Sequence, residues 1–82
     1  MKNFFYVYIL TSENDSTRHY TGFTEDIDKR LKAHNAGQVP HTAKYRPWYF
    51  ETVVAFRCRE KAIEFERYLK SHSGRSFSSR HF

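Results

Sequence analysis

Several reactive side chains fall on segments of this chain that the sequence predicts to be ordered. Phenols occur at Tyr8 and Tyr20, a guanidinium and an imidazole lie four residues apart at Arg30 and His34, and a carboxylate occurs at Glu66. A guanidinium binds a phosphate with two parallel hydrogen bonds, and a carboxylate can hold a divalent cation that acts as a Lewis acid. A phenol or an imidazole can take a proton from water. Together these groups have the chemistry to cleave a phosphodiester bond.

Each of these residues also has an ordinary structural interpretation. Tyr8 suits a half-buried strand position, and Arg30 suits a solvated helix position. His34 can simply pack or face solvent, and Glu66 has Lys70 at the i+4 spacing of a surface ion pair. Taken singly, each residue favours the structural interpretation, so the elements that position them must decide.

Two strands are predicted near the start of the chain. Residues 4–11 and 18–23 are aromatic and β-branched runs, which favour strands. The polar segment 12–17 between them is a cluster of turn formers, so we expect an antiparallel hairpin. Because side chains alternate along a strand, Tyr8 and Tyr20 can lie on one face of this hairpin.

A helix is predicted to follow, with Thr24 as its N-cap and acidic residues in the first turn. Apolar residues at helical spacing continue it, and Gly37 is a stop signal. Arg30 and His34 are four residues apart, so they stack on one face of this helix.

The second half of the chain predicts one more strand and one more helix. Residues 48–56 are apolar enough to predict a central strand. Residues 59–72 predict a helix with one apolar stripe, which Gly74 is expected to end. The tail 76–82 is expected to dock through its two phenylalanines as a turn or short helix. The order β-β-α-β-α predicts an α+β fold, with a small three-stranded antiparallel sheet flanked by helices, in a single domain over residues 1–82.

The composition is typical of an ordered globular chain, because 39% of the residues are hydrophobic and 18% are aromatic, enough for a small core. The single cysteine, Cys58, excludes an internal disulfide. No segment is long and apolar enough to span a membrane. We therefore expect a cytoplasmic protein with no membrane partner.

Positive charge accumulates in the second half of the chain. The net charge is +5, and residues 44–82 carry nine basic and four acidic side chains, whereas residues 1–43 carry five of each. A local basic field suits a polyanion such as nucleic acid, although a basic tail on a soluble protein is equally compatible with the charge alone. The candidate nucleic-acid-binding residues are Lys44, Arg46, Lys70, Arg75 and Arg80.

Four sequence blocks resemble, in order, the motifs of the GIY-YIG nuclease family, in its small stand-alone form. They cover about residues 4–75, and the family's order of elements agrees with the order predicted above. The N-terminal domain of the excinuclease catalytic subunit is a similar module. The blocks are Tyr6-Val7-Tyr8 with Tyr20-Thr21-Gly22 eleven residues later, DIDKRLKAHNAG at 26–37, TAKYRPW at 42–48 and EKAIEFERYLK at 60–70.

The resemblance implies a role for each residue of the first blocks. Tyr8 and Tyr20 would line the active site, with Tyr8 as the general base. Arg30 would bind the scissile phosphate, and His34 would assist proton transfer or phosphate binding. Gly22 would let the backbone turn tightly beside the site.

The last block implies a metal site. Glu66 would be the protein ligand of a Mg2+ or Mn2+ ion, and Glu64 is a rival on a different face of the same helix. The implied function is a divalent-metal-dependent endonuclease, a hydrolase of phosphodiester bonds, with DNA favoured over RNA and DNA repair as its setting. A catalytically inactive nucleic-acid-binding module is the alternative, and a protein-interaction domain that uses exposed aromatic surface is a third.

Overall fold

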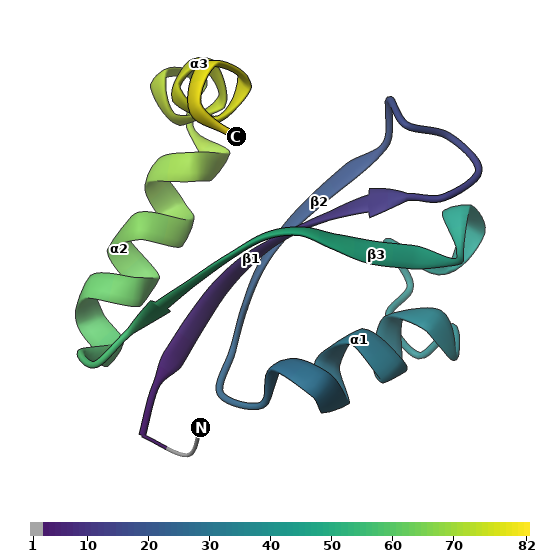
Figure 1. Cartoon of the computed structure of the whole chain (residues 1–82), viewed down its shortest axis with the longest axis horizontal. Helices are drawn as coiled ribbons and strands as arrows, with labels where there is room; N and C mark the ends of the chain where they lie inside the picture. Colours follow the sequence, from purple (N-terminus) through teal and green to yellow (C-terminus); the bar gives the residue numbers. More distant parts are fainter. Residues whose placement is uncertain (1–2) are drawn as a thin grey trace.

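The computed structural model describes residues 3–82, apart from the side chain of His72, and contains a three-stranded sheet with helices packed around it (Figure 1). The predicted order β-β-α-β-α is confirmed, and one further helix follows it. The elements are β1 (Phe5–Ser12), β2 (His19–Thr24), α1 (Ile27–Asn35), the 3-10 turn η1 (Ala43–Tyr45), β3 (Trp48–Phe56), α2 (Arg59–Lys70) and α3 (His72–His81).

The sheet is antiparallel and its strand order is β2-β1-β3. The central strand is therefore β1, and the prediction that residues 48–56 form the central strand is wrong. Almost every residue of β1 is buried, whereas the residues of β3 alternate between exposed and partly buried. The apolar run at 48–56 has a different cause.

That cause is a set of apolar side chains on exposed positions, since Tyr49 and Val53 are 44% and 42% exposed. The strand also contains a β-bulge at Glu51. Ile9 pairs with Thr52 but Leu10 pairs with Phe50, so Glu51 has no residue opposite it on β1. The extra residue reverses the alternation of side chains, and the two halves of β3 therefore pack on opposite faces of the sheet. The buried and partly buried residues of β3 therefore stay at even-numbered positions on both sides of the bulge.

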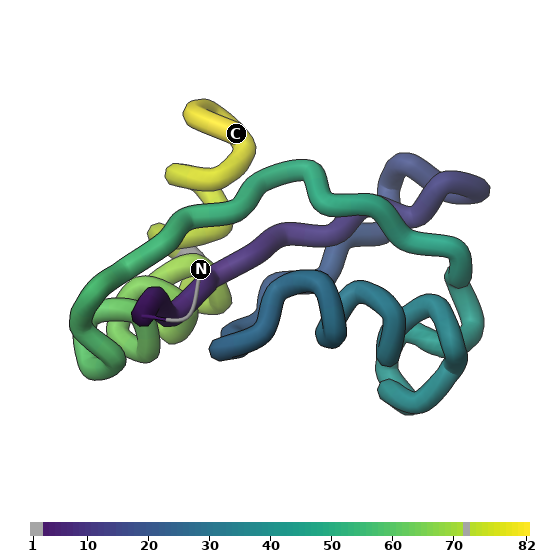
Figure 2. The backbone as a smooth tube through the Cα atoms, turned by 60° about the horizontal axis from the view of Figure 1, so that its bottom comes forward, coloured from purple at the N-terminus to yellow at the C-terminus, as the bar shows by residue number. Residues whose placement is uncertain are grey.

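The two main helices pack on opposite faces of β1. Val7 and Ile9 contact Ala62 and Leu69 of α2 in one apolar cluster. On the other face, Tyr8, Leu10 and Trp48 form a second cluster, against which the apolar residues of α1 pack. Figure 2 shows α1 running beneath the strands, which curve over it. Tyr8 is thus directed toward α1.

The start of α1 differs from the prediction. Asp26, and not Thr24, is the N-cap, because its carboxylate accepts a hydrogen bond from the Lys29 N–H at 3.1 Å. Thr24 instead ends β2, and its hydroxyl accepts from the Asp26 N–H at 3.1 Å. The predicted stop is confirmed, since Gly37 follows the C-cap with a φ of 78°, a conformation that favours glycine.

Gly74 does not end α2, contrary to the prediction. The helix stops at Lys70, and Ser71 begins α3 as its N-cap by accepting a hydrogen bond from the Gly74 N–H at 3.1 Å. The tail forms a helix and docks through Phe77, which packs against the α2-side cluster of Val7, Ile9, Ala62 and Leu69. The expected docking of Phe82 is wrong, because Phe82 is 43% exposed and its ring contacts that of Phe77 in the same tail. None of the helices in residues 3–82 has the length and apolar character needed to cross a bilayer.

Candidate active site

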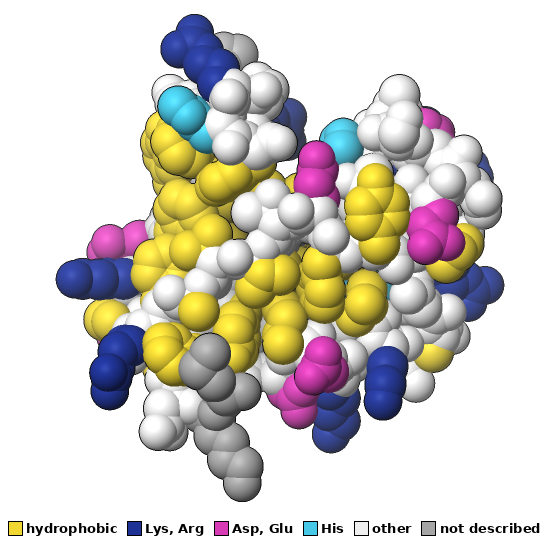
Figure 3. Space-filling model, in the orientation of Figure 1, with side chains coloured by type: hydrophobic (Ala, Val, Ile, Leu, Met, Phe, Trp, Pro, Cys, Tyr) yellow, Lys and Arg dark blue, Asp and Glu magenta, His cyan; other side chains and the backbone are white. Residues whose placement is uncertain are grey.

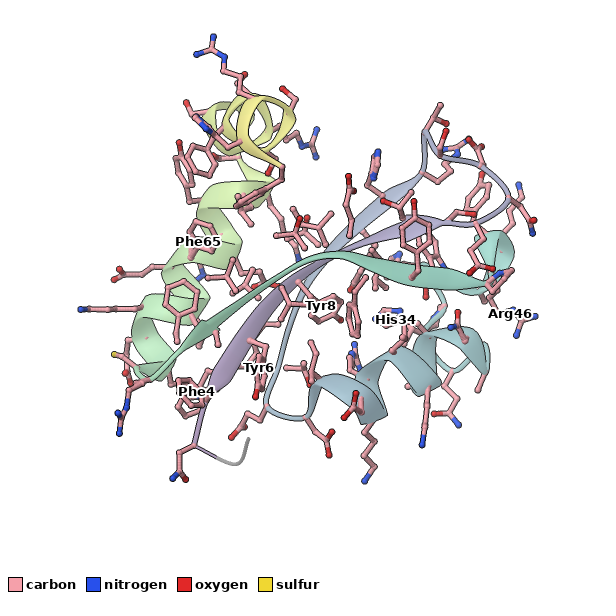
Figure 4. All side chains as sticks on the ribbon, viewed as in Figure 1. Phe4, Tyr6, Tyr8, His34, Arg46 and Phe65 are labelled. Carbon is pink, nitrogen blue, oxygen red and sulfur yellow. The ribbon has the colours of Figure 1, made fainter. Side chains whose placement is uncertain are left out.

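The phenol oxygen of Tyr8 joins the two polar residues that α1 carries. It accepts a hydrogen bond from Arg30 Nε at 3.2 Å and lies 2.9 Å from His34 Nε2. Arg30 and His34 reach the same oxygen because they are one turn apart, so the predicted stacking on one helix face is confirmed. Figure 4 shows the Tyr8 side chain between β1 and α1, with His34 on the α1 side.

His34 is fully buried, with no exposed surface. Its second ring nitrogen, Nδ1, lies 2.7 Å from Thr42 Oγ1, so both nitrogens have protein partners. Burial, together with the positive charge of Arg30, lowers the pKa of His34 to about 4. The imidazole is therefore neutral at pH 7. It fixes the position of the Tyr8 hydroxyl through the contact at Nε2. Thr42 was missed from the sequence, where its only signal was its place in the TAKYRPW block.

Gly22 is directly opposite Tyr8 in the β1–β2 register. A Cβ atom at this position would overlap the Tyr8 ring and its oxygen. The glycine therefore provides space for the ring to cross β2. The expected tight backbone turn at Gly22 is wrong, because this residue lies within a regular strand.

Tyr20 completes the aromatic part of the site. Its ring centroid lies 6.4 Å from that of Tyr8 and 5.0 Å from that of His34, and the side chain is only partly buried. The hydrogen bond to Tyr8, and additionally the Tyr20 phenol, raise the pKa of Arg30. The guanidinium therefore lies between two phenols and stays charged.

Glu66 enters the site from α2. Its side chain is 19% exposed, whereas the rival Glu64 is exposed. Burial raises the pKa of Tyr8, the hydrogen bond from Arg30 opposes that shift, and the Glu66 carboxylate adds to it. Lys70 links this carboxylate to the aromatic part of the site, because its Nζ lies 3.1 Å from Glu66 Oε2 and 5.9 Å from the centre of the Tyr20 ring. We call Tyr8, Tyr20, Arg30, His34 and Glu66 the Tyr8 cluster.

The Tyr8 cluster agrees with the comparisons to known proteins. Residues 4–79 match the family model of the GIY-YIG catalytic domain. The chain belongs to the GIY-YIG family. This family is of nuclease type and acts on nucleic acid, so the resemblance noted in the sequence is confirmed.

Several UPF0213 proteins are similar to this chain. The GIY-YIG domain is 37% identical over 71 residues to a UPF0213 protein of Halalkalibacterium halodurans, covering 85% of this chain and 73% of the relative. It is 32% identical over 74 residues to a UPF0213 protein of Haloquadratum walsbyi, covering 89% and 81%. The solution NMR structure of the UPF0213 protein from Bacillus halodurans superposes with a TM-score of 0.56 at 32% identity, covering 93% of this chain and 80% of that one.

The donor set near Glu66 suits a metal that also binds substrate. Among the described side chains, no three His, Cys, Asp or Glu residues gather to hold an ion by themselves. Mg2+ commonly needs only one or two carboxylates, because waters and substrate phosphates supply its other ligands. Lys70 Nζ lies 3.1 Å from Glu66 Oε2, so the i+4 ion pair weighed from the sequence is present. A metal would compete with that ammonium.

The five predicted nucleic-acid-binding residues are dispersed in this GIY-YIG domain. Lys70 adjoins the Tyr8 cluster, with its Nζ 5.9 Å from the centre of the Tyr20 ring, and Arg75 lines a neighbouring hollow. Arg80 is exposed on α3. Lys44 and Arg46 are exposed around η1, and Figure 4 places Arg46 at the end of the molecule away from Tyr8. The structure thus brings Lys70 to the site and Arg75 to the hollow beside it.

Proposed function

We propose that this GIY-YIG domain is a divalent-metal-dependent endonuclease that hydrolyses phosphodiester bonds in DNA. The observation that carries the proposal is the placement of Arg30. Its guanidinium is fixed by the Tyr8 oxygen at 3.2 Å, beside the partly exposed Tyr20. From α2, Glu66 pairs with Lys70, whose Nζ lies 5.9 Å from the centre of the Tyr20 ring. A phosphate clamp, a phenol and a carboxylate from three different elements are thus gathered in one place.

Arg30 is assigned to the scissile phosphate. Its Nε–H is used by Tyr8, which leaves the terminal NH2 groups as donors for phosphate oxygens. Negative charge accumulates on those oxygens as water attacks, and a prepositioned guanidinium stabilises it. Because Tyr8 fixes the guanidinium before substrate arrives, no ordering cost is added at the reaction.

Tyr20 is assigned as the group that accepts the proton of the attacking water. A general base must lie within hydrogen-bond reach of that water. Tyr8 has no exposed surface, its pKa is raised by burial, and its oxygen is already shared by Arg30 and His34. Tyr20 is the phenol of the pair that solvent reaches. Tyr8 and His34 are then positioning residues, in place of the base and proton-transfer roles that the resemblance implies.

Glu66 is assigned as the protein ligand for Mg2+ or Mn2+. A metal bound there would supply Lewis-acid polarisation of the phosphate and help to stabilise the leaving oxygen. The location of the carboxylate supports this assignment, because its partner Lys70 lies with Nζ 5.9 Å from the centre of the Tyr20 ring. A bound metal would displace Lys70 from the pair. Lys70 would then be released toward the negative substrate.

The test is a cleavage assay on labelled plasmid, branched DNA, single strands and RNA, each with Mg2+, Mn2+ or EDTA. We expect the parent to cleave DNA only when a metal is present. The cleavage rate should fall at least a hundredfold in Arg30→Ala and in Glu66→Ala, because loss of one charge-stabilising group typically lowers kcat by about 10²–10³. Arg67→Ala and Glu64→Ala are matched controls, because both residues are exposed on α2. They should cleave like the parent.

Two outcomes would change the assignment. If Glu66→Ala cleaves as fast as the parent, Glu66 is not the metal ligand. If the parent binds the nucleic acids but cuts none of them with either metal, the chain is the inactive binding module.

A further inference from the structure

A hollow of about 770 Å³ lies between the β1–β2 hairpin and α3, next to the Tyr8 cluster. Figure 3 shows it as a notch between the lobe formed by α3 and the lobe of the hairpin. Tyr20 and Lys70 belong both to its lining and to the surroundings of Arg30 and Glu66. The hollow thus adjoins the proposed site of cleavage at the β2 edge of the sheet.

One wall of the hollow is a polar face of α3. Arg75, Ser78, Ser79 and Phe82 line it, and their i, i+3, i+4, i+7 spacing places them on a single helix face. The helix is anchored elsewhere, because Phe77 packs against the α2-side cluster. Arg75, Ser79 and Phe82 are exposed, so this face offers a guanidinium and hydroxyls to whatever occupies the hollow.

The facing wall carries a carboxylate that is held in place. Glu51 is the bulged residue of β3, and bulges commonly re-aim a side chain beside a site. Its Oε2 accepts a hydrogen bond from the buried Thr11 hydroxyl at 2.6 Å, and His19 Nδ1 lies 3.4 Å from the same oxygen. Both Glu51 and His19 line the hollow. The carboxylate is therefore an ordered acceptor.

These walls match the chemistry of a nucleotide. Arg75 and Lys70 attract a phosphate, and aromatic rings such as those of Tyr20 and Phe82 stack with bases. A carboxylate accepts hydrogen bonds from exocyclic amino groups and repels a carbonyl oxygen, so it distinguishes cytosine from thymine. The volume of about 770 Å³ lies in the range of pockets that bind one small-molecule unit, such as a nucleotide.

We propose that this hollow binds one unpaired nucleotide adjacent to the scissile phosphate, with the amino group of a cytosine or adenine base facing Glu51. The phosphate side faces Arg75 and Lys70, and the base side faces β3. This inference deepens the proposed function and rests on it for the position of the scissile bond. The binding of the nucleotide itself does not depend on cleavage.

The test therefore measures binding under conditions without cleavage. Fluorescein-labelled oligo(dC), oligo(dA) and oligo(dT) of equal length are titrated with the full chain in EDTA, and anisotropy gives each Kd. We expect oligo(dC) and oligo(dA) to bind about tenfold more tightly than oligo(dT), the discrimination of one good base contact. In Glu51→Gln the ratio should fall to about one, because an amide both donates and accepts. Glu25→Gln, at an exposed acid outside the hollow, should keep the parent ratio.

A second variant tests the phosphate wall. Arg75→Ala should weaken binding of all three oligonucleotides by a similar factor and lower the slope of log K against log salt by about one. Arg57→Ala removes an exposed arginine outside the hollow and should change neither. Circular dichroism confirms that each variant is folded.

The outcomes separate the two proposals. Unchanged Kd values in folded Glu51→Gln and Arg75→Ala would overturn the hollow as a nucleotide site, even if the parent cleaves DNA. Equal parent affinity for the three oligonucleotides, or no binding, would overturn it as well. A base preference that Glu51→Gln abolishes, in a parent that never cleaves, would support the hollow and reject the nuclease.

Discussion

Gly22 lies opposite Tyr8 in the β1–β2 register, and the Tyr8 ring fills the space that a side chain at Gly22 would need. This approach places the phenol oxygen beside α1, where Arg30 donates to it at 3.2 Å. The glycine of the second motif triplet is therefore required by the tyrosine of the first. The two triplets, although separated in sequence, form one packing unit.

The first prediction concerns Gly22→Ala. The added methyl group overlaps the Tyr8 ring, so the ring or the strand must shift and Arg30 loses its support. We expect the free energy of unfolding to fall by about 1–3 kcal/mol, as for overpacking, and cleavage to fall at least tenfold. Urea denaturation and initial cleavage rates measure the two effects.

The control is Gly37→Ala, which strains a φ of 78° and should lower the free energy of unfolding by about 1 kcal/mol without affecting Tyr8. Parent-like cleavage by Gly22→Ala would show that ring placement is not needed.

The second prediction separates the two phenols. Tyr20→Phe should reduce cleavage by about 10²-fold or more and leave stability within about 0.5 kcal/mol, because its side chain is partly exposed. Tyr8→Phe should also destabilise the fold, by about 1–3 kcal/mol, since the buried His34 Nε2 loses its partner. Cleavage rates and urea midpoints of both variants separate the loss of activity from the loss of stability. Retained activity in Tyr20→Phe would return the role of base to Tyr8.

Local signals in the sequence were sufficient for most of the fold. The α1 face that carries Arg30 and His34 follows from helical spacing alone, and both residues reach the same phenol. Gly37 has the left-handed conformation that its position after the helix predicted. These features depend on residues within one or two turns, which is the range over which propensity and capping act.

Features that depend on distant pairing could not be predicted. The bulge at Glu51 exists only in the register between β1 and β3. The exposure of Tyr49 and Val53, which look like core residues in the sequence, depends on the position of β3 at the edge of the sheet. The contact of Thr42 with His34 spans a loop, so nothing local marks Thr42 as part of the site. The burial of Tyr8 and His34, which shifts the expected base to Tyr20, likewise results from packing between elements.

The third prediction follows from the buried imidazole of His34. Its pKa is about 4 in the folded chain and near 6.5 when unfolded, so the unfolded state binds the proton more readily. The neutral imidazole therefore contributes about 3 kcal/mol to the free energy of unfolding. This contribution is fully present above pH 6.5 and is lost as the pH falls toward 4. Urea titrations at pH 7 and pH 4.5 measure it. His34→Gln should be less stable at pH 7 and lose less stability over this interval. An equal loss in both proteins would assign the pH dependence to other groups.

The last prediction concerns the ion pair between Lys70 and Glu66. The ammonium lies 3.1 Å from the carboxylate that we assign to the metal, so the two cations compete for one ligand. Lys70→Met keeps the apolar stem but removes the charge, and Mn2+ affinity without nucleic acid should rise about two- to fivefold, the strength of a half-exposed pair. Calorimetric titration measures this affinity.

Two variants serve as controls. Lys61→Met, at an exposed position of the same helix, should leave the Mn2+ affinity unchanged, and Glu66→Gln should abolish Mn2+ binding. Equal affinity in Lys70→Met and the parent would show that the pair does not oppose the metal. Binding that survives in Glu66→Gln would place the metal elsewhere.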